Sequence, residues 1–162
     1  MSGSGKSTLI EELTKRGYKA VDTDWNPAWE EPSERSDGAG WLWREDRIDE
    51  LLDLEDSEIL FVAACVENQR RFYARFDQVV LLSVTPEITV RRLATRTSNE
   101  YGKRSDELAD VLRYKETVEP LLRRAATLEI DTGAPLSTVV ERVLALVEDQ
   151  SPPPYGSQPE RK

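Results

Sequence analysis

The sequence predicts an α/β fold in which a parallel β-sheet is covered by helices on both faces. Short apolar runs alternate along the chain with longer segments whose apolar residues recur at helical spacing. Runs such as Val79–Leu82 are continuously apolar, as expected of strands buried on both faces. Strands that alternate with helices favour parallel pairing, because each crossover helix returns the chain to the same edge of the sheet.

Each element can be assigned in order. Apolar, β-prone runs predict four strands over residues 18–21, 59–64, 78–84 and 128–130. Helical periodicity predicts a first helix that ends near Gly17 and further helices over 43–54, 68–75, 85–96, 105–125 and 136–147. Pro120 should bend or break the fifth of these, and residues 25–41 should form an irregular insert. We expect one domain over residues 1–150 and a disordered Pro-rich tail over 151–162.

Composition bounds the function. A chain of 162 residues with 38% apolar and 33% charged residues suits one soluble domain. Its net charge of −9 argues against nonspecific nucleic-acid binding, and its apolar runs are too short to cross a membrane. Because no leader opens the chain, we expect a cytoplasmic protein, monomeric or weakly dimeric. One cysteine and no histidine leave acid–base work to carboxylates, Lys or Tyr.

The charge is distributed unevenly along the chain. Five cations fall between residues 91 and 104, where the only acid is Glu100; they are Arg91, Arg92, Arg96, Lys103 and Arg104. A basic segment on an acidic protein suits a small polyanionic ligand better than a polymer.

A phosphate-binding motif opens the chain. Residues 3–8 match the second half of G-x-x-x-x-G-K-[ST], through Gly3, Ser4, Gly5, Lys6, Ser7 and Thr8. Small residues let backbone amides surround a phosphate, and the helix that follows directs its positive end at the anion. Lys6 would reach the β- and γ-phosphates of ATP, and the Ser7 hydroxyl would ligate Mg²⁺. The alternative is a flexible start to an ordinary helix.

The motif is incomplete at its start. Its first glycine would fall one position before Met1, and so would the apolar strand that normally delivers such a loop. We therefore expect a sheet that lacks its first strand, and a natural reading frame that begins upstream of Met1.

Two classes of P-loop protein fit the sequence poorly. Motor-type and AAA-type ATPases need an acid at the end of a buried strand to polarise water, but the run 59–64 is followed by Cys65, with no acid before Glu67. The Asn-Lys-x-Asp guanine reader of GTPases is also absent.

Residues 1–147 resemble the P-loop small-molecule kinases, which include shikimate, gluconate and nucleoside monophosphate kinases. Asp22-Thr23-Asp24 follows the second strand of such a fold, as an Asp-x-Asp pair does in shikimate kinases. The resemblance makes Asp22 a carboxylate on the metal side and Asp24 the base or the group that positions the acceptor. The alternative is a solvated turn or a helix-capping pair.

The resemblance also implies an acceptor pocket. Trp43-Arg44 resembles the Phe-Arg pair whose arginine holds the substrate carboxylate in shikimate kinases, so Trp43 and Arg44 are candidate substrate contacts. A surface ion pair with Glu45 or Asp46 is nearly as good an interpretation of Arg44. The four tryptophans fall within nineteen residues and would either stack on a ring or cover the edge of the sheet; they are Trp25, Trp29, Trp41 and Trp43.

The basic segment resembles a kinase lid. Residues 92–96 are similar to the Arg-Leu-x-x-Arg run that opens the lid in nucleotide and gluconate kinases. The resemblance implies that Arg96 contacts adenine or the phosphates, and that Lys103 and Arg104 close over the transferring group, which excludes water. The alternative is a basic helix end that interacts with the helix dipole. Asp131-Thr132-Gly133 is a weaker candidate for the adenine loop.

The match to shikimate kinases fails at two points. Their glycine cluster after the third strand is replaced by 63-Ala-Ala-Cys-65, and their late substrate arginine is absent from the stretch 118–122. The sequence therefore predicts an ATP- and Mg²⁺-dependent kinase that acts on a small molecule of unknown identity. The alternatives are an ATP-binding module of the AAA/P-loop type without transfer activity, and a nucleoside monophosphate kinase-like enzyme.

Overall fold

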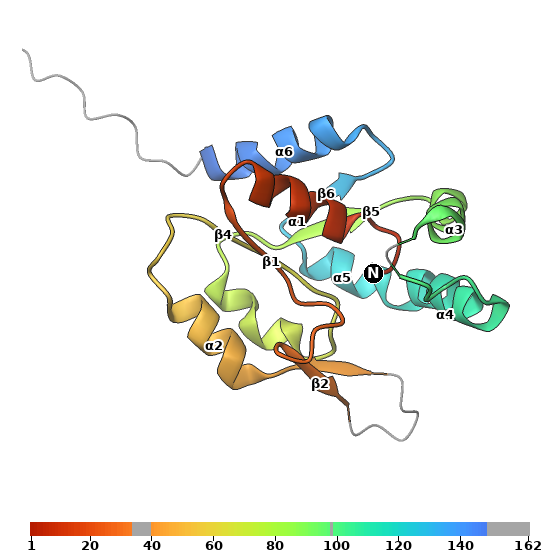
Figure 1. Ribbon diagram of the computed structural model, residues 1–162, viewed down its shortest axis with the longest axis horizontal. Helices are drawn as coiled ribbons and strands as arrows, with labels where there is room; N and C mark the ends of the chain where they lie inside the picture. Colours follow the sequence, from red (N-terminus) through yellow and green to blue (C-terminus); the bar gives the residue numbers. More distant parts are fainter. Residues whose placement is uncertain (34–39, 98, 149–162) are drawn as a thin grey trace, which may run out of the picture.

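The computed structural model describes residues 1–33, 40–97 and 99–148 (Figure 1). Its strands are β1 (Lys19–Asp22), β2 (Glu30–Pro32), β3 (Trp41–Trp43), β4 (Leu60–Ala63), β5 (Val80–Ser83) and β6 (Leu128–Asp131). Its helices are α1 (Lys6–Lys15), α2 (Glu45–Asp53), the 3₁₀ helix η1 (Gln69–Arg75), α3 (Pro86–Thr95), α4 (Ser105–Thr117), α5 (Glu119–Ala125) and α6 (Leu136–Glu148). The tail predicted over 151–162 lies outside the described residues.

The predicted helix boundaries are close to the observed ones. Thr85 caps α3, with its hydroxyl accepting a bond from the Ile88 amide, and Pro86 stands at the first helical turn. Pro120 breaks the predicted fifth helix into α4 and α5, because its ring cannot be accommodated in a helix interior. The insert expected over 25–41 was wrong in one respect: it contains β2, whose partner β3 begins at residue 41, and the two pair antiparallel. Neither strand alternates apolar and polar residues.

The strands form three separate pairs. β1 pairs parallel with β4, and β5 pairs parallel with β6, which confirms the predicted parallel α/β architecture. The inner edges of β4 and β5 do not pair with each other. A largely apolar cavity of about 620 Å³ is lined by residues of both, and by Leu9, Ile10 and Val143 from the helices above. Within the described part of the chain no strand fills this gap.

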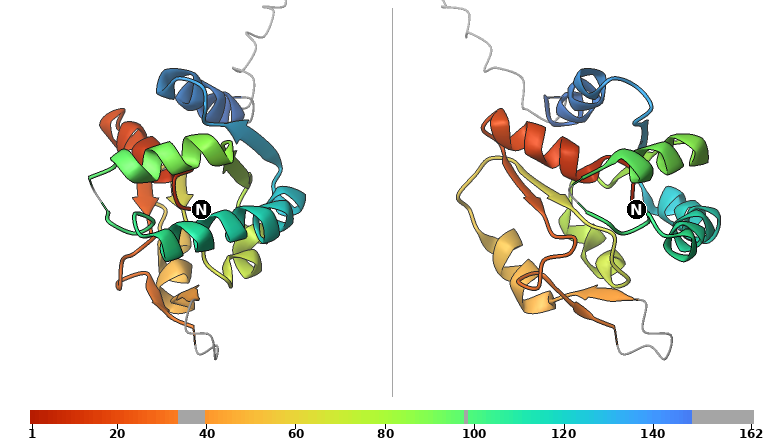
Figure 2. Two further views of the ribbon diagram at one scale, coloured as in Figure 1. Left: turned by 90° about the vertical axis from the view of Figure 1, so that its right-hand side faces the viewer. Right: turned by 45° about the vertical axis from the view of Figure 1, so that its right-hand side comes forward.

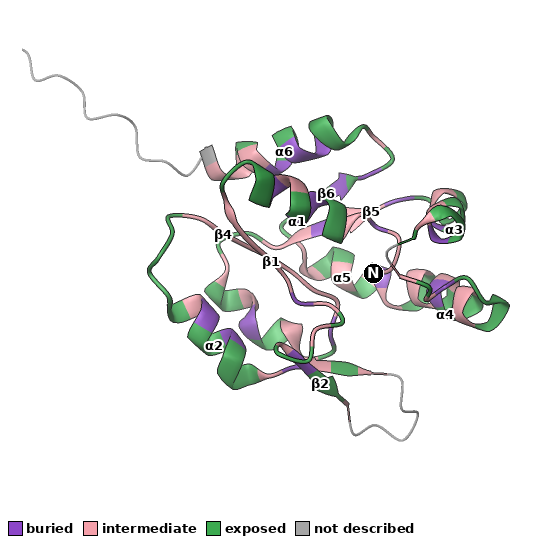
Figure 3. Cartoon of the chain, viewed as in Figure 1, coloured by how far each residue is buried: buried purple, intermediate pink, exposed green. Residues whose placement is uncertain are grey.

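Helices cover both sides of the strands (Figures 1 and 2). α1 and α6 lie together on one side, where Leu13, Ile130 and Val140 form the centre of the larger core cluster. α2 and η1 lie on the other side, with Trp43, Ile48 and Phe72 in a second cluster. Figure 3 shows that these helices are buried along one face only, as their amphipathic sequences predict.

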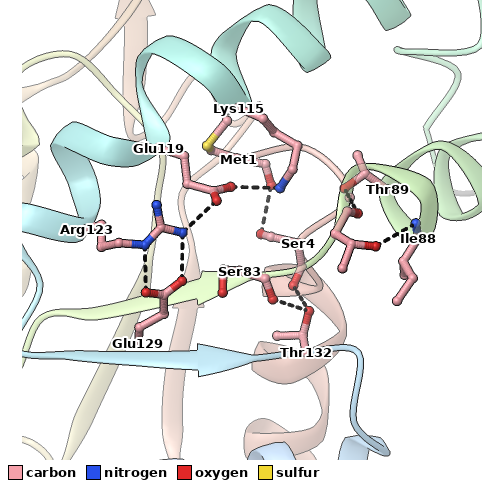
Figure 4. Close-up of polar contacts among 12 residues, drawn as sticks. Met1, Ser4, Ser83, Ile88, Thr89, Lys115, Glu119, Arg123, Glu129 and Thr132 are labelled. Atoms are coloured by element: carbon pink, nitrogen blue, oxygen red, sulfur yellow. Dashed lines mark hydrogen bonds and ion pairs between the residues drawn. The ribbon is translucent and has the colours of Figure 1, made fainter.

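An ion-pair network attaches α4 and α5 to the last strand. Glu119, almost buried, accepts bonds from Lys115 at 2.7 Å and from Arg123 at 2.9 Å, and Arg123 also pairs with Glu129 of β6 (Figure 4). These hydrogen bonds to Arg123 lower the pKa of Glu129 to about 2. Met1 lies beside Lys115 and Glu119 of this network (Figure 4). No helix in the described ranges has both the length and the apolar character needed to cross a bilayer.

Candidate nucleotide site

The phosphate loop has the backbone that its glycines allow. Gly3 and Gly5 have φ values of 77° and 91°, in the left-handed region where a Cβ is costly. A Cβ on Gly3 would also lie 3.1 Å from the Thr89 methyl group of α3. These two positions therefore require glycine for the turn that leads into α1.

The first turn of α1 offers free hydrogen-bond donors. Gly5 is the N-cap residue, no side chain caps the helix, and its first turn holds no acid. The amides that begin a helix have no partner within it, so an anion is the natural partner for this uncapped end. Ser7 and Thr8 are exposed there, and with Lys6 they line a cavity of about 430 Å³. Its volume suits a small-molecule ligand.

The loop is anchored to the second half of the molecule. Thr132, buried just after β6, has its hydroxyl 2.9 Å from the Ser4 carbonyl oxygen and 3.2 Å from that of Ser83 (Figure 4). Arg92 of α3 donates to the Gly3 carbonyl oxygen at 3.2 Å, and to the hydroxyl and carbonyl oxygens of Thr132. Sequence reasoning placed Arg92 in a lid motif, but its observed contacts hold the loop in place.

Lys6 and Asp24 form an ion pair at the centre of the site. The Lys6 Nζ lies 2.8 Å from Asp24 Oδ2, and Asp24 Oδ1 accepts the Cys65 amide at 2.8 Å. Burial alone would lower the pKa of Lys6, but the Asp24 carboxylate outweighs it and holds that pKa above its usual value. Burial likewise opposes ionisation of Asp24, but Lys6 keeps its pKa below the usual range. Both groups are therefore charged at neutral pH.

The parallel strands bring these groups together. β1 ends at Asp22, two residues before Asp24, and its partner β4 ends at Ala63, two residues before Cys65. Carboxyl ends of parallel strands meet at one edge, where α/β proteins bind ligands. Asp22 does not line the 430 Å³ cavity; it accepts the Asp24 amide at 3.2 Å.

The residues present fit a nucleotide with Mg²⁺ in part. The uncapped amides, Lys6 and the exposed Ser7 hydroxyl match the donor set for phosphates and a hard cation. Within the described ranges no group of three or more His, Cys, Asp and Glu side chains could hold a metal ion without help. A magnesium ion would thus depend on phosphate oxygens and water in addition to Ser7, which is its usual manner of binding.

Other predicted site residues are placed differently. Arg96 lines the cavity and donates to the carbonyl oxygens of Asn99 and Tyr101, and burial lowers its pKa. Arg104 is exposed, pairs with Asp106 at 2.9 Å and does not line the cavity. Ser4 is buried and donates its hydroxyl to the Met1 carbonyl oxygen, so its side chain supports the loop from within.

Of the three predicted substrate contacts, Asp24 lines the cavity, whereas Trp43 and Arg44 lie outside it. Trp43 is 4% exposed, packs in the second core cluster and donates its indole N–H to the Thr23 hydroxyl at 2.8 Å. Its faces are therefore covered by the core. Arg44 precedes α2 and lies 3.9 Å from Asp46, as the surface ion-pair interpretation predicted. Neither residue is among those that line the 430 Å³ cavity.

Sequence reasoning missed the importance of Trp25 and Glu30. Trp25 lines the cavity, is 53% exposed and is the only non-glycine described residue with a positive φ, at 61°. Its amide donates to the Glu30 carboxylate at 2.9 Å, and burial raises the pKa of Glu30 to about 7. The clustering of four tryptophans in the sequence was a signal, but it did not indicate which ring faces the site.

Comparison with known proteins fits this geometry. A model of the AAA domain family matches residues 1–113. The chain belongs to the AAA domain family. On sequence alone, the missing acid at the end of the strand counted as evidence against AAA-type ATPases. The family match shows that this acid is not a criterion for membership of the AAA domain family, so that inference was wrong as applied to the family. The structural observation behind it stands, because β4 ends at Ala63.

Solved structures show the same fold. A shikimate kinase from Bacteroides thetaiotaomicron aligns with a TM-score of 0.63 at 20% identity, over 90% of this chain and 93% of that one. A shikimate kinase from Acinetobacter baumannii in complex with shikimate aligns with a TM-score of 0.64 at 18% identity, over 91% and 89%. No curated protein matches the chain in sequence. The chain thus has the fold of P-loop small-molecule kinases, which confirms that resemblance.

Proposed function

We propose that this protein binds ATP at the phosphate loop and transfers the γ-phosphoryl group to a hydroxyl of a small molecule. The observation that carries the proposal is the Lys6–Asp24 pair at the end of an uncapped, acid-free helix N-terminus. This arrangement places the Lys6 ammonium beside the phosphate cradle, with the Asp24 carboxylate directly next to it. Magnesium, bound through Ser7 and phosphate oxygens, would neutralise charge on the phosphates. Asp22, which does not line the cavity, would interact with the magnesium ion only through a water molecule.

Asp24 is suited to positioning more than to proton abstraction. In the proposed transfer the acceptor oxygen forms a bond to the γ-phosphorus, the bond to the β–γ bridging oxygen breaks, and ADP leaves. Phosphoryl transfer needs little base catalysis, so the hydroxyl proton can pass to water late in the reaction. A carboxylate whose pKa Lys6 holds low is a weak base but a good hydrogen-bond acceptor for that hydroxyl.

Arg96 and Arg104 are assigned by the proposal to charge stabilisation. Arg96 already lines the cavity, whereas Arg104 would have to leave Asp106 and approach the phosphates. The variant Arg104→Ala should then have a lower kcat, while its affinity for the nucleotide stays almost unchanged. A matched control is Arg113→Ala, which removes an exposed arginine paired with Asp110 on the same helix.

The test is ADP release from Mg-ATP across a panel of sugars, sugar acids, shikimate-like acids and nucleoside monophosphates. Turnover should depend on a cognate acceptor, and Asp24→Asn should abolish transfer while a nonhydrolysable ATP analogue still raises the Tm. Asp56→Asn, which removes only a surface pair with Lys19, is the control. Normal transfer by Asp24→Asn would refute the role of Asp24.

The AAA domain match favours a second candidate, an ATP-binding module without transfer activity. Under this function the Lys6–Asp24 pair would respond to nucleotide by rearranging the loop after β1. Stabilisation by the ATP analogue, with no ADP release for any acceptor in the panel, would favour this candidate over the kinase.

A further inference from the structure

An exposed aromatic cluster borders the candidate nucleotide site. The Trp25 ring centroid lies 6.0 Å from that of Trp41 and 5.4 Å from that of Tyr101, with interplanar angles of 60° and 47°. The three rings, which we term the aromatic lip, come from the loop after β1, from β3 and from the connection between α3 and α4. Trp25 and Trp41 remain 53% and 37% exposed. Large side chains so exposed add little to the core.

The backbone holds Trp25 in a strained conformation. A non-glycine residue at φ 61° costs on the order of 1 kcal/mol or more, and the local structure must impose it. The Trp25 amide donates to the buried Glu30 carboxylate at 2.9 Å, and the Asn26 side chain accepts the Ala28 amide at 3.0 Å within the same loop. These contacts fix the ring at the edge of the cavity, one residue beyond Asp24.

Three carboxyl groups lie close to the lip. Asp24 precedes Trp25, Glu30 lies beneath its amide, and Asp22 is close enough to raise the pKa of Glu30 further. The cations among the described lining residues are already engaged: Lys6 by Asp24, Arg92 by Gly3 and Thr132, and Arg96 by two backbone carbonyls. An anionic acceptor would therefore find no uncommitted cation among these residues to receive it.

We infer that the aromatic lip binds an acceptor that is a hydroxylated ring without negative charge, such as a neutral sugar or cyclic polyol. The ring lies against the indole of Trp25, and a hydroxyl donates to Asp24, next to the phosphate loop. Trp41 and Tyr101 support the Trp25 indole at its edges. This inference rests on the proposed function and sharpens it, since Arg44 suggested an anionic acceptor on sequence alone.

The inference can be tested with a variant that keeps the fold. Trp25→Gly removes the ring and places at φ 61° the residue that adopts this conformation at no steric cost. Relief of the backbone strain offsets part of the stability lost with the ring contacts, so the Tm should fall by no more than about 4 °C. Its KM for the acceptor should rise at least tenfold, while kcat at saturation and the affinity for the ATP analogue stay within about twofold. Trp29→Phe, in a partly buried neighbour packed on the second core cluster, is the matched control.

A direct binding measurement separates the two proposals. With Mg²⁺ and a nonhydrolysable ATP analogue, neutral sugars and cyclic polyols should quench tryptophan fluorescence in the wild type and not in Trp25→Gly, whereas the corresponding sugar acids should bind at least tenfold more weakly. Turnover with an acid acceptor, unchanged by Trp25→Gly, would overturn the lip assignment and leave the kinase intact. Quenching by neutral rings, combined with no ADP release when Mg-ATP replaces the analogue, would support the aromatic lip and refute the kinase.

Discussion

At the scale of single residues, the site depends on groups whose neighbours set their charge. Lys6 and Asp24 keep each other ionised, because both are too buried for solvent alone to stabilise their charges. Glu30 is the opposite case, because it is buried beside other carboxylates. The segment from Asp24 to the start of β2 thus contains one carboxylate held ionised and one that resists ionisation.

The raised pKa of Glu30 predicts that the stability of the fold depends on pH. Its pKa is about 7 in the folded protein and near 4.5 otherwise, so between these values the folded state binds a proton that the unfolded state does not. Stability should therefore fall as pH rises through this window. Thermal melts of Glu30→Gln should show a Tm equal to wild type near pH 4.5 and higher by about 6–12 °C at pH 8, because a pKa raised from 4.5 to about 7 corresponds to ~3 kcal/mol and each kcal/mol to about 2–4 °C.

The control for this prediction is Glu31→Gln, which alters the exposed neighbour on β2. Its melts should follow the wild type at every pH. Parallel Tm curves for Glu30→Gln and wild type would contradict the assigned titration.

Trp43 predicts a loss of stability without a loss of acceptor binding. Trp43→Phe removes the buried bond to Thr23 and leaves a small void, at a combined cost of about 1–2 kcal/mol. The Tm should drop by about 3–6 °C, with KM for the acceptor unchanged, whereas Trp41→Phe at an exposed position should leave the Tm within about 1 °C. If Trp43→Phe instead raised the KM for the acceptor and left the Tm unchanged, Trp43 would have to be a substrate contact.

At the scale of elements, α3 acts as a support for the phosphate loop. Arg92 uses its planar guanidinium to join the loop to the segment after β6, and Thr89 lies against Gly3. Two elements that lie 89 and 128 residues further along the chain therefore set the shape of a six-residue motif.

This role predicts that Arg92→Lys weakens nucleotide binding. A lysine carries the charge but cannot form the forked set of bonds to Gly3 and Thr132. The loss of two bonds of about 1 kcal/mol each should weaken binding of the ATP analogue roughly thirtyfold by calorimetry. The neighbouring exposed residue offers a matched control, Arg91→Lys, for which we expect no change. Equal affinities in the two variants would mean that Arg92 does not shape the loop.

Elements also show how far the sequence could predict this protein. Four strands and most helices could be predicted from apolar runs, helical periodicity and capping residues, because these signals lie within the segment that forms each element. β2 and β3 could not, since Glu30 and Pro32 form a strand only through pairing with Trp43 and Trp41. The phosphate loop was evident from spacing, whereas Trp25 and Arg92 depend on contacts between distant segments, which spacing does not report.

At the scale of the whole molecule, the main feature is the gap between β4 and β5, whose facing edges are not paired with each other. Two parallel pairs each present an inner edge to an apolar cavity of about 620 Å³, and unpaired backbone groups in such a place are costly. A strand parallel to both would satisfy these groups and bury apolar surface.

The gap predicts that an added strand stabilises the fold. A variant extended before Met1 by five Val and Ile residues and a glycine turn should gain at least about 5 °C in Tm, because several ladder bonds and buried side chains form together. An extension of equal length built from Gly and Ser is the control. Equal melting temperatures for the two extensions would show that the gap does not accept a strand.

The anchoring of the phosphate loop has a further consequence for cooperativity. Lys6 joins the loop to the β1–β4 pair through Asp24, and Arg92 and Thr132 join it to the β5–β6 pair. Since the two pairs share no backbone ladder, this short loop is a main polar connection between them at their carboxyl ends. A nucleotide that orders the loop would thus couple the unfolding of both halves, and amide hydrogens of β4 and β5 should exchange as one unit when it is bound and as two when it is absent.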